Sequence, residues 1–334
     1  MLKRPRTRLA LAVFAFANLV LLMAGFLAPY TATEQHREFA YAPPTRVHFV
    51  DAKRFHLRPF VYRLAAMDRD DVSYREDESA AYPIYFFTRV GGAVHLFAVA
   101  QPGNIFVFGT DGFGRDVFSR ILYGGRVSIA AALLATLLAL LIGTVLGGIA
   151  GQFGGIADAV VMRGVELALA LPWIYLLLAL RAALPLHVGA TQTFLLISAV
   201  IGFMGWARPA RLIRGVVLSA KEQLFVTAAR GFGASEWYVL RRHVLPQALG
   251  IVITQAVILV PQFITAEATL SYLGLGMNEP VPSWGNMLGA FQHVQVMSSY
   301  WWMASPIVAL VLLSSSYFAL ADVFHRVVSG KSHA

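Results

Sequence analysis

The chain has 334 residues, of which 57% are hydrophobic and only 13% are charged, and its mean hydropathy of +0.63 indicates an integral membrane protein and excludes an ordinary soluble one. The net charge of +9 does not indicate nucleic-acid binding, because basic residues beside membrane spans explain it and the sequence lacks a basic and aromatic recognition module. The chain has no cysteine, which excludes disulfides, thiolate catalysis and cysteine-ligated metals.

Six nearly uncharged apolar windows predict six transmembrane helices, because a bilayer core about 30 Å thick needs about 20 such residues. The windows are Leu9–Ala28, Ser128–Ala150, Ala159–Leu180, Thr193–Trp206, Ala248–Leu270 and Trp301–Ala321. The third window carries Glu166 near its start and the fourth is short, so their ends are the least defined. The first window follows a basic start, as in a signal peptide, but its length predicts an uncleaved anchor.

Basic residues in short loops predict the orientation, because Lys and Arg resist translocation. With the N-terminus inside, the cytoplasmic segments hold 14 basic residues and the short outer loops hold one, Arg181. Both termini are therefore predicted to be cytoplasmic in a multi-pass protein of the inner (plasma) membrane. The predicted parts are the N-terminus with the first helix (1–30), an outer segment (31–127), a five-helix core (128–325) that includes a cytoplasmic loop (208–246), and a cytoplasmic tail (326–334).

The long outer segment is predicted to carry a small folded periplasmic lobe. Tyr82–Arg89 and Ala93–Val99 are rich in β-branched and aromatic residues and flank two glycines, which predicts a β-hairpin. Met67–Ser79 is dense in charge, and we interpret it as a solvated loop rather than a cation site.

Two features of the predicted helices concern packing. Glycines recur at four-residue spacing from the second helix into the turn after it, at Gly143, Gly147 and Gly151. This spacing predicts one helical stripe where another helix can approach closely, although the last glycine can equally belong to the turn. Pro172 and Pro261 fall inside the third and fifth windows and predict kinks, because each proline removes one intrahelical hydrogen bond.

The longest predicted cytoplasmic loop encodes a helix–turn–helix. Val226–Phe232 predicts a short helix that ends at Gly233, whose missing Cβ suits a left-handed backbone. Ser235 predicts the N-cap of a second helix, with Glu236 in its first turn. Three basic residues fill the predicted last turn, with His243 as a helix-end cation, and Pro246 begins the next segment.

This loop resembles the EAA motif of ABC importer permeases, in which Glu-Ala-Ala is followed by three residues, Gly, and a His-Ile-Leu-Pro-like end. The matching residues are Thr227, Ala228, Ala229, Gly233, His243, Val244, Leu245 and Pro246. The resemblance implies a coupling helix that docks into a groove of an ATP-binding subunit, through Ala228, Ala229, Gly233, Glu236, Arg241 and their neighbours. Thr227 replaces the usual Glu and removes a charge that favours a helix N-terminus.

A second block, Phe108–Ser128, resembles the GTDxxGRDxxSRxxxGxRxS block of the C-type permease in dipeptide, oligopeptide and nickel importers. The residues in register are Gly109, Thr110, Asp111, Gly114, Arg115, Asp116, Ser119, Arg120, Gly124, Arg126 and Ser128. Such residues allow a tight polar turn tied by charge-assisted hydrogen bonds, and both a structural clamp and a substrate contact are open. Glu267–Gly276, followed by Trp284, resembles the block of that class at the end of the fifth span.

The resemblance covers residues 105–325 and implies an all-α integral membrane protein with the type I ABC importer permease fold. It implies a non-catalytic subunit that carries peptides inward. The implied partners are a second, homologous permease in a heterodimer, two ATP-binding subunits, a periplasmic or lipid-anchored solute-binding protein and the lipid bilayer. No cofactor or metal is predicted for this chain, because ATP and Mg would be bound by the partner subunits and no complete Walker A sequence is present.

Alternatives remain open for the solute and for the transporter class. Nickel or another small solute could replace the peptide. A secondary transporter predicts inverted repeats and charged midplane residues, and a membrane-bound enzyme predicts clustered catalytic groups; the sequence contains neither pattern. Glu166, Glu267 and Asp322 are candidates for either a substrate site or an interfacial role, because they lie near predicted span ends.

Overall fold

The computed structural model describes residues 5–51, 54–66, 74–183, 185 and 188–328. The chain divides into two compact units, which are described separately below. The first unit consists of Met1–Phe14, Ile129–Leu270 and Leu313–Ala334, and the second consists of Ala15–Ser128 and Ser271–Leu312. Some basic residues used to predict the orientation lie outside the described residues, namely Lys3, Arg4 and Lys331.

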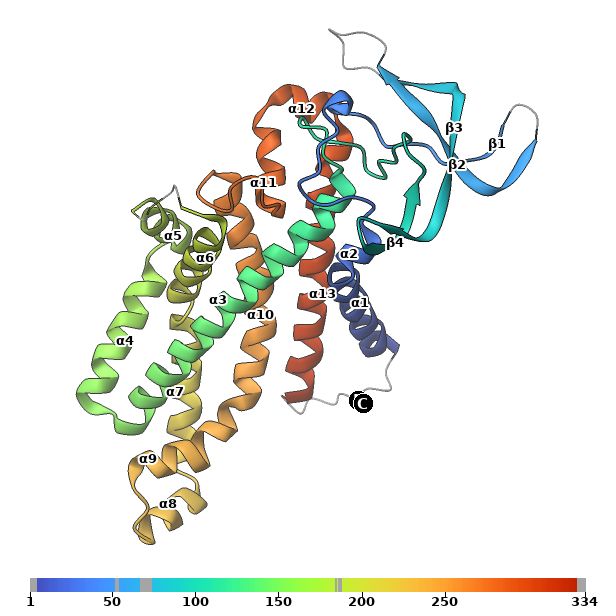
Figure 1. The fold of residues 1–334 in the computed structure, drawn as a ribbon. Coiled ribbons are helices and arrows are strands. Elements are labelled where there is room, and N and C mark those ends of the chain that lie inside the picture. Colours follow the sequence, from blue (N-terminus) through green and yellow to red (C-terminus); the bar gives the residue numbers. More distant parts are fainter. Residues whose placement is uncertain (1–4, 52–53, 67–73, 184, 186–187, 329–334) are drawn as a thin grey trace. The chain divides into compact units, whose positions relative to one another are not determined.

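The larger helices of the chain match the apolar windows in place but not always in continuity (Figure 1). They are α1 (Pro5–Leu22), α3 (Val117–Phe153), α4 (Gly155–Ala170), α5 (Trp173–Ala182), α6 (Ala190–Met204), α7 (Ala207–Lys221), α8 (Leu224–Gly231), α10 (Leu245–Tyr272) and α13 (Ser305–Val328). The shorter ones are α2 (Ala24–Leu27), η1 (Arg37–Phe39), α9 (Glu236–Val239), η2 (Leu240–Val244), α11 (Trp284–Leu288), η3 (Gly289–Gln292), α12 (Val294–Ser299) and η4 (Trp301–Ala304).

Within the described residues, three continuous helical stretches are long and apolar enough to cross a membrane. They are Val117–Phe153, Glu236–Tyr272 and Trp301–Phe324. The pairs α4–α5 and α6–α7 are bent by 94° and 45°, and the count reaches five if each pair is one span. The apolar stretch of α1, Thr7–Leu22, is shorter. The structure thus contains three to five candidate spans, and the count of six stays a prediction.

The third window is not a single helix. Its predicted range, Ala159–Leu180, is interrupted where Leu171 and Pro172 adopt extended backbone angles between α4 and α5. Pro172 disfavours helical geometry at the residue before it and cannot donate a backbone hydrogen bond, so the predicted kink is a complete break. Pro261, in contrast, lies inside α10, and that helix continues through it.

In the first unit, the glycines of α3 lie against α7. A Cβ added at Gly143 would lie 2.7 Å from the Cβ of Pro209, and one added at Gly151 would lie 2.7 Å from the Cβ of Val217. A Cβ at Gly147 would overlap the carbonyl oxygen of Ala210. All three distances are shorter than ordinary carbon contacts, so the two helix backbones approach more closely than any side chain at these positions would allow.

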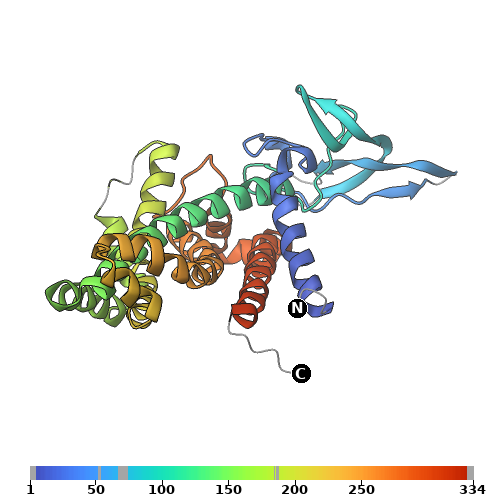
Figure 2. The same ribbon diagram turned by 90° about the horizontal axis from the view of Figure 1, so that it is seen from below.

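The second unit contains a four-stranded antiparallel sheet in the order β1-β2-β3-β4 (Figures 1 and 2). The strands are β1 (His48–Val50), β2 (Phe55–Ala66), β3 (Tyr74–Val90) and β4 (Ala93–Val99). The predicted hairpin is confirmed, since β3 pairs with β4 from Ile84↔Val99 to Val90↔Ala93. Gly91 and Gly92 form its turn with φ values of +58° and +86°, the left-handed pair that a two-residue hairpin turn requires.

The predicted solvated loop Met67–Ser79 is wrong for the part that the structure describes. Tyr74–Ser79 belongs to β3, where Tyr74, Arg75, Glu76 and Asp77 pair with β2. Pairing with a neighbouring strand satisfies this backbone while Arg75 and Glu78 stay exposed, so charge density alone did not identify a loop. The rest of that prediction, residues 67–73, lies outside the described residues.

Candidate functional site

The predicted helix–turn–helix is confirmed as local structure. We call residues 224–239 the α8–α9 hairpin. α8 ends at Gly231, Gly233 has a φ of +83°, and its N–H donates to the carbonyl of Arg230 at 2.9 Å. The hydroxyl of Ser235 accepts a hydrogen bond from the Tyr238 N–H at 3.3 Å and caps α9. The two short helices are thus fixed by a left-handed glycine and a side-chain cap.

The predicted end of the second helix before Pro246 is wrong. Leu240–Val244 forms a π-helical turn in which the Leu245 N–H donates to the Leu240 carbonyl, and α10 begins at once. Pro246 therefore lies directly after the π-helical turn, inside the continuous helical stretch Glu236–Tyr272. His243 lies inside this continuous helical stretch, so the predicted helix-end cation is also wrong.

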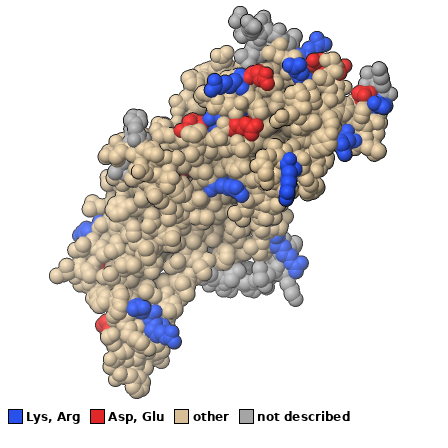
Figure 3. Space-filling view, viewed as in Figure 1, with Lys and Arg blue, Asp and Glu red and all other residues tan. Residues whose placement is uncertain are grey.

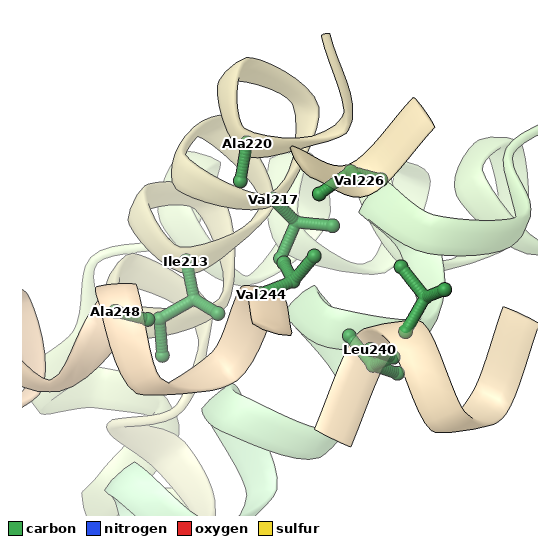
Figure 4. Close-up of a cluster of buried hydrophobic side chains, with 8 residues drawn as sticks. Ile213, Val217, Ala220, Val226, Leu240, Val244 and Ala248 are labelled. Carbon is green, nitrogen blue, oxygen red and sulfur yellow. The ribbon is translucent and has the colours of Figure 1, made fainter. Parts of the chain in front are cut away.

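A cluster of fully buried apolar side chains holds the α8–α9 hairpin against α7 and the start of α10 (Figure 4). Its members come from all of these elements: Ile213, Val217, Ala220, Val226, Val239, Leu240, Val244 and Ala248. Two of the predicted coupling residues, Ala229 and Leu245, are half-buried and pack against it. Each buried aliphatic side chain stabilises such a cluster by roughly 1.5–3 kcal/mol, so the hairpin is anchored from its inner side.

The outer side of the α8–α9 hairpin is apolar and uncovered. Phe232 is 92% exposed and Leu224 is 87% exposed, and Trp237 and Tyr238 are also exposed. Six predicted coupling residues are exposed on the same segment: Thr227, Ala228, Gly233, Glu236, Arg241 and Pro246. The sequence interpretation missed Phe232 and Leu224, although large apolar residues in an otherwise polar loop are a usable signal.

Polar contacts join the base of the α8–α9 hairpin to the end of α3. Glu236 accepts hydrogen bonds from the Arg230 guanidinium at 2.9 Å and from the side-chain amide of Gln152. The ammonium of Lys221 donates to the carbonyls of Gly151 and Gln152 at 3.2 and 2.8 Å. A cation at the carbonyl end of a helix is favourable, so these contacts tie α3, α7 and α9 together.

Basic side chains gather at this end of the first unit. Figure 3 shows Lys and Arg beside α8 and α9, whereas the visible surface along the neighbouring long helices is almost uncharged. Arg241 and Arg242 are both exposed there. The surface thus combines exposed aromatic side chains with positive charge, a composition typical of protein interfaces.

In the second unit, the predicted polar block builds a buried ionic network. We call Asp111, Arg115, Arg120 and Glu279 the Asp111 network. The Arg115 guanidinium donates to Asp111 at 2.7 Å and to both oxygens of Glu279 at 2.5 and 3.1 Å, and Arg120 donates to Glu279 at 2.9 Å. The side chains of Arg120, Arg115 and Asp111 are 1%, 6% and 10% exposed. Glu279 is 44% exposed, so two buried cations are neutralised by one buried carboxylate and one that reaches the surface.

The remaining residues of the block shape the turn before α3. Gly109 and Gly114 have φ values of +66° and +71°. Thr110 accepts a hydrogen bond from the Ala42 N–H at 2.7 Å and donates to the carbonyl of Phe39. Asp116 accepts hydrogen bonds from the backbone and the hydroxyl of Ser119 at 2.8 and 2.6 Å. Burial raises the pKa of Asp116 to about 7, although the two Ser119 hydrogen bonds oppose this shift.

Glu279 is the member of the Asp111 network that the sequence interpretation missed. It lies about 160 residues along the chain from Arg115 and Arg120, so no local spacing connects them. In the same unit, the indole of Trp284 donates to the Ile121 carbonyl at 3.0 Å. The segment after α10 is thus tied to the start of α3 by one ionic contact and one buried aromatic contact.

Each unit contains a cavity. In the first unit, an open cavity of about 620 Å³ lies where the α4–α5 and α6–α7 breaks face the proline of α10, with Pro172, Trp173, Arg208, Pro261 and Gln262 in its lining. In the second unit, about 400 Å³ lies beside the Asp111 network. Among the described side chains, no three His, Asp or Glu groups are close enough to hold a metal ion. The cavities fit organic solutes in size.

The three acidic candidates near span ends occupy different environments. Glu166 is exposed and pairs with Arg163 at 3.1 Å, Glu267 is fully buried in α10, and Asp322 is exposed on α13. None of them lines either cavity.

Comparison with known proteins identifies transport proteins. The family described as binding-protein-dependent transport system inner membrane component matches residues 143–330. The dipeptide transport system permease protein DppC of Bacillus subtilis (strain 168) is 37% identical over 195 residues, which cover 58% of this chain and 59% of that protein. The oligopeptide transport system permease protein OppC of Escherichia coli (strain K12) is 42% identical over 181 residues, 54% of this chain and 58% of that protein. The chain thus spans less than two thirds of the length of these relatives.

Two solved structures are also similar. The MetNI methionine ABC transporter in an inward-facing conformation gives a TM-score of 0.43 at 20% identity and covers 62% of this chain and 95% of that one. An amino acid ABC transporter with histidines gives a TM-score of 0.42 at 17% identity, and the match covers 63% of this chain and 91% of that one.

Proposed function

Because the chain belongs to the family of binding-protein-dependent transport system inner membrane components, we propose that it is a permease subunit of an ATP-driven peptide importer. The names of the relatives support a peptide as the solute. The observation that carries the proposal is the α8–α9 hairpin, whose inner side is anchored in a buried cluster and whose outer side exposes aromatic side chains. Such a surface needs a partner, and an ATP-binding subunit is the partner that import requires.

The proposed topology has six spans with both termini in the cytoplasm. The spans are α1, α3, the bent pair α4–α5, the bent pair α6–α7, α10 and α13, and the sheet of the second unit lies in the periplasm. The apolar composition of the longest helices and the basic residues beside α8 and α9 support this arrangement. We keep the predicted division of the chain into the N-terminus with the first helix (1–30), the outer segment (31–127), the five-helix core (128–325) and the cytoplasmic tail (326–334).

The proposed coupling passes from the α8–α9 hairpin into the spans. Docking of an ATP-binding subunit would cover Phe232, Leu224 and the exposed EAA-like residues. When ATP closes two such subunits, the hairpin would move with its partner and carry α7 and α10, because the buried cluster joins all three. The Lys221 contacts extend this rigid connection to α3. Two arrangements that ATP and a loaded solute-binding protein favour differently are sufficient for alternating access.

The proposed pathway runs beside a second, homologous permease. The 620 Å³ cavity at the two helix breaks supports a path for a short peptide, since irregular backbone inside a membrane is tolerated where it lines a cavity. We assign the Asp111 network to a structural clamp, because its charges are neutralised internally. Nickel or another small solute remains the second candidate for the cargo.

The test uses the full chain copurified with its ATP-binding subunits and reconstituted in liposomes with the solute-binding protein. Gly233→Pro should abolish dipeptide uptake or release the ATPase, because proline cannot adopt the φ of +83°. Gly231→Ala is the matched control, since an added Cβ there meets open space. Unchanged ATP-driven uptake by Gly233→Pro would overturn the coupling role. Stimulation of ATP hydrolysis by Ni²⁺ but not by dipeptides would overturn the peptide assignment.

A further inference from the structure

The end of the β3–β4 hairpin exposes several large apolar side chains in the second unit. Phe87 is 70% exposed and Phe86 is 55% exposed, and Tyr85, Val90 and Val94 are also exposed near the turn. The pairing of Arg89 with Val94 places Tyr85 and Val94 on one face of the hairpin and Phe86 and Val90 on the other, and we call the five side chains together the patch. A soluble lobe rarely leaves so many aromatic side chains uncovered on one short hairpin. The patch therefore needs a partner that neither the coupling proposal nor the peptide proposal provides.

The backbone at the centre of this patch is strained. Phe87 has a φ of +53°, in the left-handed region that bulky residues rarely adopt. Strain of this kind costs of the order of 1–3 kcal/mol and persists where the position of a side chain matters. The strained residue is also the most exposed aromatic side chain of the hairpin, so the cost is not recovered by burial.

The hairpin is fixed to the end of the first apolar helix. β4 packs against α2 (Figure 1). The rings of Phe26 and Phe87 lie 6.1 Å apart. The buried imidazole of His95 forms a hydrogen bond of 2.6 Å with the carbonyl of Ala28. These contacts place Phe87 near the level of Phe26, which is about 6 Å beyond Leu22 at the helical rise of 1.5 Å per residue.

α1, which precedes α2 in the chain, carries an exposed apolar stripe. Phe16, Leu19 and Leu22 are 68%, 52% and 69% exposed at three-residue spacing, while Leu21 and Ala24 on the other face are buried. In a chain whose α1 crosses the bilayer, as the proposed function requires, this stripe faces lipid. The contact between Phe26 and Phe87 joins the patch to α2, which follows α1 in the chain.

The chemistry of the hairpin matches the boundary between acyl chains and headgroups. Residues 83–99 contain aromatic residues, Arg89 and His95, and no acidic residue. The guanidinium of Arg58 lies 4.8 Å from the ring centre of Tyr85. Aromatic rings with nearby arginines are typical of the membrane interface, where the rings enter the boundary and the guanidinium groups reach phosphate.

We propose that the β3–β4 hairpin inserts Phe86 and Phe87 into the interfacial layer of the phospholipid bilayer on the outer face of the membrane. The lobe is then held at a fixed height beside α1 by lipid contact as well as by protein contact. A docking site for a protein partner predicts a different environment for the same side chains, and the experiment below separates the two.

The test exploits the absence of cysteine from the chain. Single cysteines carrying a nitroxide label are placed in the full chain in liposomes of phosphatidylethanolamine and phosphatidylglycerol. The sites are Phe87→Cys, Phe86→Cys and Val94→Cys, the last of which leaves both phenylalanines in place. Glu78→Cys is the control, because it is exposed on the same strand about 30 Å away at 3.3 Å per residue. Phe16→Cys reports whether α1 lies in lipid.

We expect labels at Phe86, Phe87 and Val94 to collide with oxygen and to be poorly accessible to the water-soluble nickel reagent. We expect the same behaviour of the label at Phe16. The label at Glu78 should show the opposite preference. Two results would overturn the proposal: access of the nickel reagent at Phe87 equal to that at Glu78, or poor access of both reagents, which indicates coverage by protein. Either result with Phe16 in lipid leaves the proposed topology intact, whereas a water-exposed Phe16 refutes that topology as well.

Discussion

The α8–α9 hairpin and the Asp111 network are both built around left-handed glycines, yet different forces hold them. The hairpin is anchored by fully buried aliphatic side chains and exposes Phe232 and Leu224. The Asp111 network is held by the buried guanidinium groups of Arg115 and Arg120, by the buried carboxylate of Asp111 and by the more exposed carboxylate of Glu279.

This difference separates stability from function. Removing one partner of a buried ionic network leaves an uncompensated charge, so its residues should dominate the free energy of unfolding. An exposed aromatic side chain contributes little to folding and much to docking. Substitutions in the Asp111 network should therefore act on the fold, and substitutions on the outer side of the hairpin should act on coupling.

The largest effect is expected for Asp111→Ala. Asp111 accepts bonds from the Arg115 guanidinium at 2.7 Å and from the Arg115 N–H at 3.0 Å, and its loss leaves a buried cation with one partner fewer. We expect the free energy of unfolding to fall by about 3–5 kcal/mol, measured by thermal melting of the purified chain. Glu78→Ala, at an exposed position of β3, is the control. Equal melting temperatures for the two variants would contradict the assignment of a structural clamp.

The next largest effect is the pH dependence of the free energy of unfolding that Asp116 causes. The pKa of Asp116 is raised by burial to about 7, so the folded protein keeps a proton that the unfolded chain releases near pH 3.8. The contribution of this proton is complete below the unfolded value and disappears as the pH rises through 7, with a loss of the order of 2–4 kcal/mol. Asp116→Asn should remove this difference between pH 4 and pH 8. An unchanged pH profile of melting would show that Asp116 does not titrate in this range.

A smaller effect is expected for Gly147→Ala, which tests the close packing of α3 against α7. The added Cβ would overlap the carbonyl oxygen of Ala210 on α7. Overpacking of this kind costs about 1–3 kcal/mol in melting experiments. Gly215→Ala, where a Cβ meets open space, should be neutral or stabilising by up to about 1 kcal/mol. Equal melting temperatures for Gly147→Ala and Gly215→Ala would show that the close packing of α3 on α7 does not contribute to stability.

The sequence predicted those parts of the molecule that depend on local chemistry. The glycine stop at Gly233, the Ser235 cap and the β3–β4 turn each follow from two to five neighbouring residues, and the structure contains all three. The same reasoning placed the apolar helices, because their signal extends over about 20 residues.

Features that depend on tertiary contacts were not predictable in this way. Pro172 ends α4 whereas Pro261 lies inside a continuous α10, although both are prolines in apolar windows. Glu279 reaches Arg115 across about 160 residues, and Tyr74–Ser79 becomes a strand because β2 lies beside it. The local sequence is compatible with more than one conformation at these positions, and the tertiary contacts determine which one forms.

The smallest change in stability and the sharpest functional loss should coincide in Phe232→Ser. Phe232 is 92% exposed, so its removal should alter the free energy of unfolding by no more than about 0.5 kcal/mol. If an ATP-binding subunit covers it, the loss of an aromatic anchor should weaken docking by about 2 kcal/mol, or roughly thirtyfold in Kd. Titration of the ATP-binding subunit against the reconstituted chain measures this, with Leu57→Ser as a control of equal exposure, 94%, on β2. The melting temperature should stay constant in both variants. A loss of affinity for the ATP-binding subunit in Phe232→Ser but not in Leu57→Ser would assign the outer side of the hairpin to docking. Equal affinities of the two variants would contradict a role of that surface in coupling.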